Sequence, residues 1–349
     1  MSRTAFRLWI GVNSLIVAGF AVWILQPAAT APPPEHRIVP EHPTPTATLG
    51  PATLTKADVM AIDGLRFGLS APDVPWSGER LGQLAATAGA SPTLIQIFTK
   101  WTEDYPVEAV ELAYQRGAVP VVSWEPWAGS AYGTEQPNYA LSRIIDGAFD
   151  EYIKEFAAAV RAHGWPVAIR FAHEMNGHWY PWSEQSPDNR EGEYVQVWRH
   201  VHDLFQAVGA TNVIWVWSVN ILRPVPDVSL EALYPGDDYV DWVGVTGYAV
   251  AETTAAEVFE PTLAALREFT DKPVVITETG AQPSRHKADW IRDFFRWLSD
   301  RSDVIGFIWF EYDQNSGGNQ NWRFTENDGT IDAFHDGIEQ SDLAPAPIS

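Results

Sequence analysis

Two glutamates, Glu174 and Glu278, each follow a short apolar run and lie in a stretch that contains no other acidic residue. Two carboxyl groups about 5–5.5 Å apart can hydrolyse a glycosidic bond, one as proton donor to the leaving oxygen and the other as nucleophile. The histidines beside Glu174 raise the alternative of a zinc site. A helical zinc motif places its histidines four residues apart, whereas His173 and His178 are five apart. The sequence therefore favours a carboxyl pair, and we expect no metal and no cofactor.

Eight short apolar runs predict the strands that would position these glutamates. They are rich in β-branched and aromatic residues and too short for helices, as buried parallel strands should be. The runs are 65–70, 93–99, 118–124, 167–171, 213–218, 242–246, 274–277 and 304–309. Helical patterns between them include 144–163, 193–208, 255–270 and 287–301. This alternation predicts an α/β fold, a (β/α)8 TIM barrel. An open doubly wound sheet is less favoured, because no glycine-rich phosphate loop follows the first run.

Polar and aromatic residues follow the predicted strands where each one ends. In a TIM barrel the site lies at the C-terminal ends of the strands. The fourth and seventh strands face each other across the barrel, so Glu174 and Glu278 are expected to meet over its centre. Polar groups beside flat apolar faces predict a site for carbohydrate.

The stretch R-x-x-H-E-M-N-G-x-W-Y-x-W at 170–182 resembles the signature of glycoside hydrolase family 26, the β-mannanase family. The resemblance continues through Y-P-G-D-x-Y-V-D-W-V-G at 234–244 and K-P-V-V-I-T-E-T-G at 272–280, and it covers nearly all of the chain after the linker. It implies that Glu174 is the acid/base and Glu278 the nucleophile of a retaining double displacement. It also implies that further residues bind substrate or orient the site: Arg170, His173, Asn176, Trp179, Tyr248 and Trp309. Among these, Tyr248 would donate to Glu278, and Trp179 and Trp309 would be sugar platforms.

One segment departs from the family pattern. Ser123-Trp124 is followed by Glu125 where family mannanases usually carry a histidine. This form resembles the members that cut mixed-linkage β-1,3-1,4-glucan. We count Trp124 and Glu125 among the substrate-binding candidates, although Glu125 could equally cap the next helix. The expected substrate is therefore either β-mannan or mixed-linkage glucan.

The charge balance narrows the class of partner. Lys and Arg number 23 against 45 Asp and Glu, a net charge of −22, so nucleic acid is not expected and a neutral β-linked polysaccharide fits better. The absence of cysteine excludes thiol catalysis and disulfides. The main hypothesis is a retaining endo-β-glycanase. The alternative is a non-catalytic carbohydrate-binding or exopolysaccharide-assembly protein on the same barrel.

The N-terminal part has the composition of a membrane signal and a spacer. Basic residues precede an apolar run of about 18 residues, so we predict a signal-anchor or signal peptide over 1–25. A Pro/Thr/Ala-rich linker follows over 26–54, then a catalytic domain over 55–340 and a flexible tail over 341–349. The expected location is extracytoplasmic. The protein would be anchored by its N-terminal helix, or secreted if that segment is cleaved.

Overall fold

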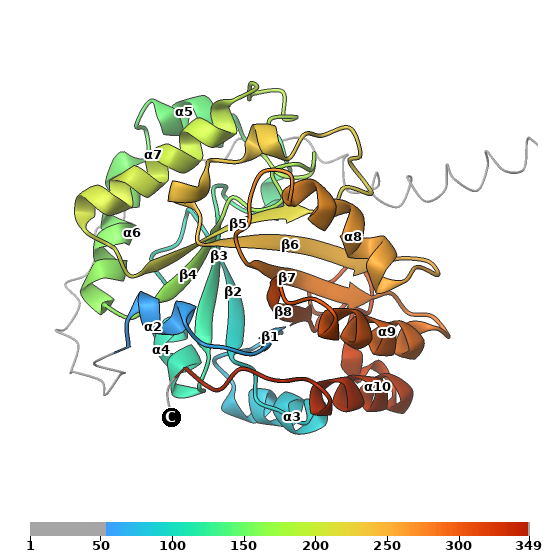
Figure 1. Ribbon diagram of the computed structural model, residues 1–349. Helices are drawn as coiled ribbons and strands as arrows, with labels where there is room; N and C mark the ends of the chain where they lie inside the picture. Colours follow the sequence, from blue (N-terminus) through green and yellow to red (C-terminus); the bar gives the residue numbers. More distant parts are fainter. Residues whose placement is uncertain (1–53, 348–349) are drawn as a thin grey trace, which may run out of the picture.

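The computed structural model describes residues 54–347, in which eight parallel strands close into a barrel in the order β1 to β8 (Figure 1). This confirms the predicted (β/α)8 fold. The strands are β1 Arg66–Ser70, β2 Leu94–Lys100, β3 Val119–Glu125, β4 Val167–Phe171, β5 Val213–Asn220, β6 Trp242–Ala249, β7 Val274–Ala281 and β8 Val304–Phe310. The predicted signal segment and almost all of the predicted linker lie outside the described residues.

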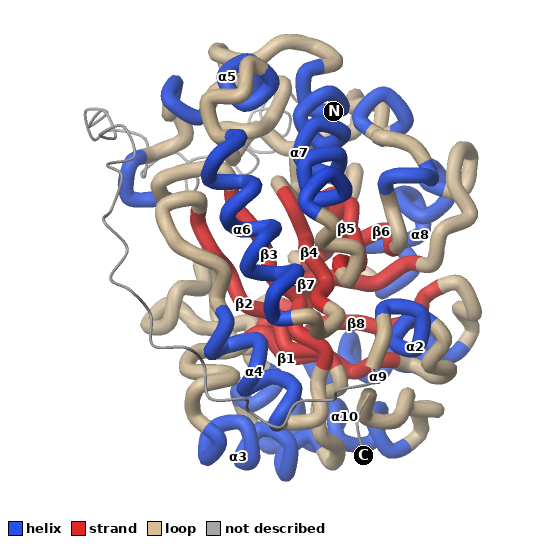
Figure 2. Tube along the Cα trace, turned by 90° about the vertical axis from the view of Figure 1, so that its left-hand side faces the viewer, coloured by secondary structure: helices blue, strands red, loops and turns tan. Residues whose placement is uncertain are grey.

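Helices surround the barrel, as the blue and red tubes of Figure 2 show. They are α2 Lys56–Met60, α3 Gly78–Ala88, α4 Val107–Gln115, α5 Leu141–Ile145, α6 Asp150–His163, α7 Glu193–Val208, α8 Ala255–Leu266, α9 Lys287–Ser299 and α10 Asp328–Glu339. The helix predicted over 144–163 is two helices, because Gly147 adopts a left-handed backbone (φ 82°) between α5 and α6. Among the described residues, no helix is long and apolar enough to cross a membrane.

Side chains along each strand alternate between the barrel interior and the layer beneath the helices. The interior cluster includes Leu94, Val121, Ile214 and Ile308, while a much larger cluster fills the space between strands and helices. This alternation decides which residues at the strand ends can reach a site over the barrel.

Strand β7 breaks the alternation with a bulge. Val245 of β6 pairs with Ile276, but the next residue, Thr246, pairs with Glu278, so β7 carries one extra residue. As a result Thr277 and Glu278 both point inward. Thr277 Oγ1 lies 2.8 Å from Ser218 Oγ inside the barrel, and Glu278 also has its partners there. The bulge brings Glu278 into the site.

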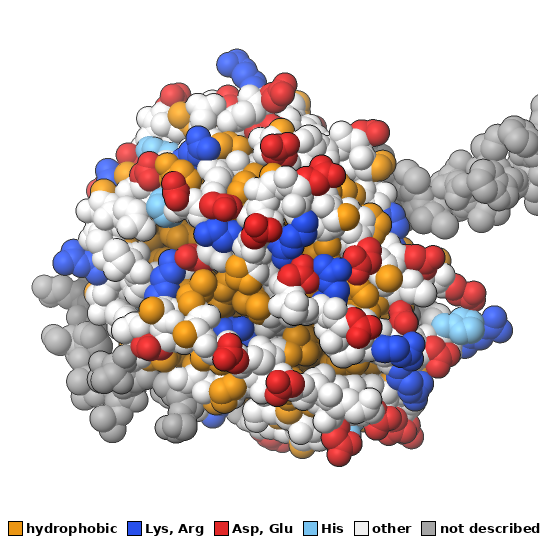
Figure 3. All heavy atoms as spheres, in the orientation of Figure 1, with side chains coloured by type: hydrophobic (Ala, Val, Ile, Leu, Met, Phe, Trp, Pro, Cys, Tyr) orange, Lys and Arg blue, Asp and Glu red, His pale blue; other side chains and the backbone are white. Residues whose placement is uncertain are grey.

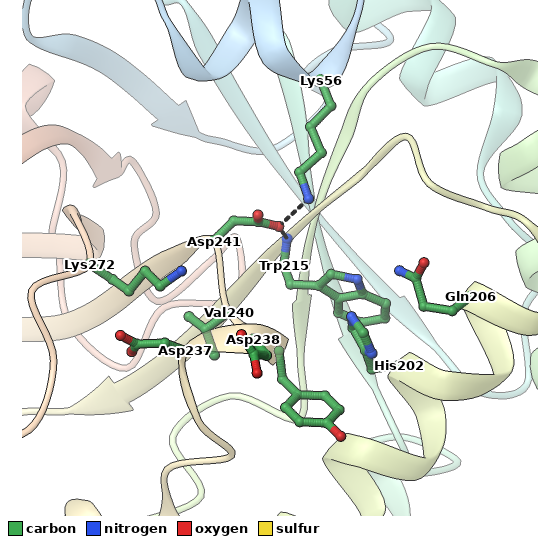
Figure 4. A pocket seen from close by; sticks show the side chains of 10 residues that line it. Lys56, His202, Gln206, Trp215, Asp237, Asp238, Val240, Asp241 and Lys272 are labelled. Atoms are coloured by element: carbon green, nitrogen blue, oxygen red, sulfur yellow. Dashed lines mark hydrogen bonds and ion pairs between the residues drawn. The ribbon is translucent and has the colours of Figure 1, made fainter.

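The N-terminal end of the barrel is closed by α2. Its Lys56 pairs with Asp241 at 2.6 Å, and the Arg66 guanidinium donates to the carbonyls of Val59 and Ile62 at 3.0 and 2.8 Å. A hollow of about 460 Å³ opens beside the Lys56–Asp241 pair (Figure 4).

The C-terminal segment also differs from the prediction. Leu343 forms a parallel bridge with Leu65, and the Leu65 N–H donates to the Asp342 carbonyl at 2.8 Å. The tail predicted as flexible from residue 341 therefore begins as a segment paired at the N-terminal end of the barrel.

Candidate active site

The structure brings the two predicted glutamates together. Glu174 follows β4 and Glu278 lies in β7, each with about 7% of its surface exposed. One carboxylate oxygen of each lies within 4.8 Å of the other. The separation of such a pair is about 5–5.5 Å in retaining glycosidases and about 6.5–9.5 Å in inverting ones, which leave room for a water between the groups.

The loop after β4 reaches this position through an uncommon backbone. Ala172 and Glu174 have φ values of 42° and 55°, a left-handed region that non-glycine residues rarely occupy. The Glu174 N–H donates to the Ser218 carbonyl of β5 at 2.7 Å, which fixes the turn. Strain of this kind persists only where the surroundings enforce it, and it concentrates at functional sites.

Arg170 lies beneath both carboxyl groups and has no exposed surface. Its Nη1 is 2.5 Å from Glu278 Oε1, and its Nη2 is 3.7 Å from Glu174 Oε1. The guanidinium also donates to Ser218 Oγ at 2.9 Å and to Thr246 Oγ1 at 2.7 Å. Arg170 therefore orients the carboxyl pair and is out of reach of a substrate.

The second oxygen of Glu278 accepts a hydrogen bond from Tyr248. The Tyr248 hydroxyl is 2.8 Å from Oε2, the contact that the family resemblance implied. Burial and the nearby Glu278 raise the pKa of Tyr248 well above its usual value, so the hydroxyl keeps its proton and remains a donor. Both oxygens of Glu278 are thereby held in a defined orientation.

The surroundings of Glu174 favour the protonated form of its carboxyl group. Burial, followed by the charge of Glu278, raises its pKa from 4.5 to about 7. Arg170 and two donors to Oε2 act in the opposite direction: Trp179 Nε1 at 2.7 Å and Asn220 Nδ2 at 3.1 Å. A carboxyl group with such a pKa can act as a general acid near neutral pH.

His173 supports this arrangement from within the protein. Its Nε2 lies 3.2 Å from the Tyr180 hydroxyl, and its carbonyl accepts from Trp182 Nε1 at 2.7 Å. Burial, with the charge of Arg170, lowers the pKa of His173 well below its usual value, so the ring is neutral. The rings of Tyr180 and Trp182 stack at 4.3 Å and pack against it.

Trp179 is half-buried and folds back over Gly177. A Cβ at residue 177 would lie 2.4 Å from the Trp179 ring, so only glycine allows the indole to reach Glu174. The residue is partly exposed beside the acid, and its role as a sugar platform stays a prediction.

Two of the predicted substrate-binding residues are placed away from the site. Trp124 is fully buried outside the barrel and stacks on Phe156 of α6 at 4.4 Å. Trp309 is also fully buried and packs edge-to-face on Phe334 of α10 at 5.1 Å. Both predictions are wrong, because each tryptophan occupies an outward strand position next to an inward one.

The prediction that Asn176 binds sugar is wrong for a different reason. Its Nδ2 donates to the Asn220 carbonyl at 2.8 Å, and its Oδ1 accepts from the Asn220 N–H at 2.9 Å. The amide is buried and engaged at both atoms in joining the β4 loop to the end of β5.

Several partly exposed rings at this end of the barrel were not predicted. Phe310, the inward neighbour of Trp309, stacks on Tyr312 at 4.4 Å and lies 5.9 Å from the Tyr248 ring. Phe98 of β2 is 37% exposed and faces His173 edge-on at 6.2 Å. Strict alternation along β2 and β8 would have identified both phenylalanines.

Glu125 lies at the end of β3, facing the site, with 6% of its surface exposed. The interpretation of this residue as a helix cap is wrong, since the next helical turn, Ser130–Tyr132, has Gly129 as its N-cap and no side-chain cap. Its Oε2 instead accepts from Trp127 Nε1 at 3.0 Å. Burial raises the pKa of Glu125 from 4.5 to about 7.

Within residues 54–347, two groups of side chains have ligand atoms close enough for a cation. His173, Glu174 and Glu278 form the first, but the Arg170 guanidinium in contact with Glu278 would repel a second cation there. His335, Asp336 and Glu339 form the second, along the outer face of α10. The donor set of the first group suits carboxyl chemistry better than metal binding.

Comparison with known proteins identifies the family. The sequence model of glycosyl hydrolase family 26 matches residues 132–336, more than half of the chain. The chain belongs to this family. It is 28% identical to Endoglucanase H of Acetivibrio thermocellus over 289 residues, 79% of this chain and 30% of that protein. It is 27% identical to a mannan endo-1,4-β-mannosidase of Bacillus subtilis over 204 residues, 57% of this chain and 49% of that protein.

Solved structures share the fold of this family 26 chain. A double mutant of the Cellulomonas fimi endo-β-1,4-mannanase superimposes with a TM-score of 0.63 at 17% identity, covering 84% of this chain and 75% of that one. The chain spans only about a third to a half of the length of the curated relatives above.

Proposed function

We propose that this protein is a retaining endo-β-glycanase that hydrolyses β-1,4 bonds in a neutral polysaccharide. The observation that carries the proposal is the buried pair of Glu174 and Glu278, with oxygens within 4.8 Å and different surroundings. Glu278 is held by a cation and a hydroxyl donor, whereas Glu174 has a pKa raised to about 7. A double displacement requires this division of roles.

In the first step Glu278 attacks the anomeric carbon and forms a glycosyl ester. The bond to the leaving oxygen breaks, and Glu174 transfers its proton to that oxygen. In the second step Glu174, now a carboxylate, takes a proton from water, which attacks the same carbon and releases Glu278. Arg170 and Tyr248 keep their contacts with Glu278, so the nucleophile is in place before substrate arrives.

Two neutral polymers are the proposed substrates, β-mannan and mixed-linkage β-1,3-1,4-glucan. A relative named an endoglucanase and one named a mannan endo-1,4-β-mannosidase cover similar shares of this chain, 79% and 80%, which supports both substrates. On the face in Figure 3, acidic side chains are spread among basic ones, and such a surface offers no attraction to a polyanion.

The first experiment compares reducing-sugar release from galactomannan and from mixed-linkage glucan by the full chain, purified in mild detergent. We expect cleavage, and we expect proton NMR to show that the first product formed has the same anomeric configuration as the bond that was cut. Inverted product would contradict the double displacement. No cleavage of any β-linked polymer would favour the non-catalytic alternative.

Chemical rescue tests the two roles separately, using an activated aryl β-oligosaccharide. With azide, Glu278→Ala should form an α-glycosyl azide, because azide enters from the face that the nucleophile has left. Glu174→Ala should form the β-glycosyl azide. Glu339→Gln, an exposed glutamate on α10, is the matched control and should retain full activity. Undiminished hydrolysis by Glu278→Ala would refute the nucleophile assignment.

We also propose an extracytoplasmic location with the N-terminal segment as anchor. The described chain begins beside α2, which closes the end of the barrel opposite the carboxyl pair. A tether at that end would leave the site facing away from a membrane. Fractionation of cells, before and after alkaline carbonate extraction, tests this, and a released mature protein would support signal cleavage instead.

A further inference from the structure

We propose that Phe98 and Glu125 form a sugar-binding subsite beside the catalytic pair, in which Glu125 acts as a neutral carboxyl group that donates a hydrogen bond to a sugar hydroxyl. The proposal rests on the glycanase function above and adds to it a pair of residues that contributes to sugar specificity.

The two side chains occupy neighbouring inward positions on adjacent strands. Phe98 of β2 pairs with Ser123 of β3, and Lys100 pairs with Glu125, so Phe98 and Glu125 are diagonal neighbours on the inner face. His173 connects them, since its ring lies 6.2 Å from Phe98 and its Nε2 lies 3.9 Å from Glu125 Oε1. They therefore form one continuous surface next to the β4 loop.

The Phe98 ring gives this surface an apolar face that is open to solvent. Phe98 is 37% exposed although it lies within a barrel strand whose inward neighbour Gln96 is buried. A pyranose ring presents C–H groups on one face and hydroxyls around its edge. A half-exposed aromatic ring beside a polar group suits such a ligand.

Glu125 has one oxygen in use and one free. Oε2 accepts from Trp127 Nε1, while Oε1 has no donor within hydrogen-bond distance among the described residues. His173 Nε2 is too far from Oε1 for a hydrogen bond, at 3.9 Å. Lys100, the neighbouring cation, bonds Glu103 at 3.3 Å instead. Oε1 is therefore the oxygen of Glu125 that is available to a ligand or to water.

Arg170 and Lys100, the two cations that face Glu125, make their hydrogen bonds to other groups. Arg170 is the buried cation of the site and is in contact with Glu278, so the negative charge is compensated there. His173 and Tyr180 are both neutral, because burial lowers the pKa of the first and raises that of the second.

Burial has the largest effect on Glu125 itself and raises its pKa to about 7, and Glu278 adds to this. The Trp127 N–H, Arg170 and Lys100 act in the opposite direction. Near neutral pH and below, Glu125 thus has a hydroxyl to donate.

The experiment measures oligosaccharide affinity by calorimetry in a Glu278→Gln parent, so that turnover does not interfere. The probes are mannotetraose and a mixed-linkage glucan tetrasaccharide, each at pH 5.5 and pH 8. The variants added to the parent are Glu125→Gln, Glu125→Ala and Phe98→Ala. Glu135→Gln, an exposed glutamate on the same β3 loop, is the matched control.

For whichever of the two oligosaccharides the parent binds more tightly, we expect the affinity to be about tenfold weaker at pH 8 than at pH 5.5, because ionised Glu125 can no longer donate a hydrogen bond. Glu125→Gln keeps a neutral donor and should bind within about threefold of the parent at pH 5.5, with little loss at pH 8. Glu125→Ala and Phe98→Ala should each lose about tenfold at pH 5.5. The control should follow the parent at both pH values.

Other outcomes overturn the proposal. Parent-like affinity in Glu125→Ala would exclude the contact, and equal losses in Glu125→Gln and Glu125→Ala would mean that the charged form acts. If an alanine variant does not fold, the glutamine variant and its pH dependence still decide. Affinity in the parent without turnover in the wild type would contradict the glycanase function alone. Turnover in the wild type with unchanged affinity in the variants would contradict the subsite alone.

Discussion

The two ends of the barrel treat charge in opposite ways. At the N-terminal end, Asp241 accepts from both Lys56 Nζ at 2.6 Å and the Trp215 N–H at 2.7 Å, beside the hollow in Figure 4. At the C-terminal end three buried carboxyl groups surround one buried guanidinium. At the N-terminal end the carboxylate is paired with a cation, whereas at the C-terminal end the carboxyl groups outnumber the cation and burial favours their protonation.

The backbone shows the same contrast. Among the described residues, four non-glycine residues have positive φ, and all lie in loops that follow strands: Asp73, Ala172, Glu174 and Ala251. Backbone strain of this kind costs about 1–3 kcal/mol per residue. The barrel thus concentrates strain and uncompensated charge where the reaction is proposed, while the opposite end stabilises the fold. Substitutions at the two ends should therefore differ in kind.

The largest effect is expected from Glu174→Gln, measured as kcat/KM against pH on the better polysaccharide. The wild type should lose activity as pH rises through about 7, tenfold per unit, because Glu174 must hold its proton. The variant should be slower by about 10²–10⁴-fold on the polymer. On an aryl substrate that needs no protonation it should be active and lack this alkaline limb. An unchanged limb in the variant would assign it to another group.

The same substitution should change stability in the opposite direction. The folded pKa of Glu174 is raised from 4.5 to about 7, so its protonated form stabilises the fold below pH 4.5 and this stability is lost as pH rises through about 7. The difference is worth on the order of 3 kcal/mol, since one pKa unit is about 1.4 kcal/mol. Glu174→Gln has no charge to bury. In urea unfolding, its free energy of unfolding should therefore be higher than that of the wild type at pH 8 and equal to it at pH 4.5. A lower stability at both pH values would contradict this.

A smaller effect is expected from Gly177→Ala. The added Cβ would clash with the Trp179 ring and move its N–H away from Glu174. Since that donor lowers the pKa of Glu174, the alkaline limb should shift upward, and kcat should fall by about tenfold. Trp179→Phe removes the same donor without the clash, and it should shift the alkaline limb of the pH profile upward by a similar amount. A shift in only one of the two variants would separate the hydrogen bond from the packing.

The sequence alone was sufficient to locate the strands and the proposed catalytic pair. Short apolar runs ended within about three residues of the observed strands, except β7, because burial on both faces leaves a strong pattern. Glu174 and Glu278 were found because carboxyl groups at the ends of facing strands must meet.

The direction of each side chain was harder to predict. Alternation would have excluded Trp124 and Trp309 in favour of Glu125 and Phe310, since adjacent strand residues face opposite sides. The same rule would have misplaced Glu278, which points inward through a bulge that depends on pairing between β6 and β7. Asn176 was misassigned because its partner, Asn220, is 44 residues away in sequence. These features depend on contacts between strands and loops.

The smallest change in activity is expected from Asp241→Asn at the N-terminal end. The amide oxygen can still accept the Trp215 N–H, but the charge that pairs with Lys56 is lost. Both side chains are partly exposed, so the free energy of unfolding should fall by only about 1 kcal/mol. Thermal unfolding should show this loss diminish in high salt, while kcat/KM and its alkaline limb stay within twofold of the wild type. A shifted limb would mean that charge at one end reaches the carboxyl groups at the other, and the separation of the two ends would fail.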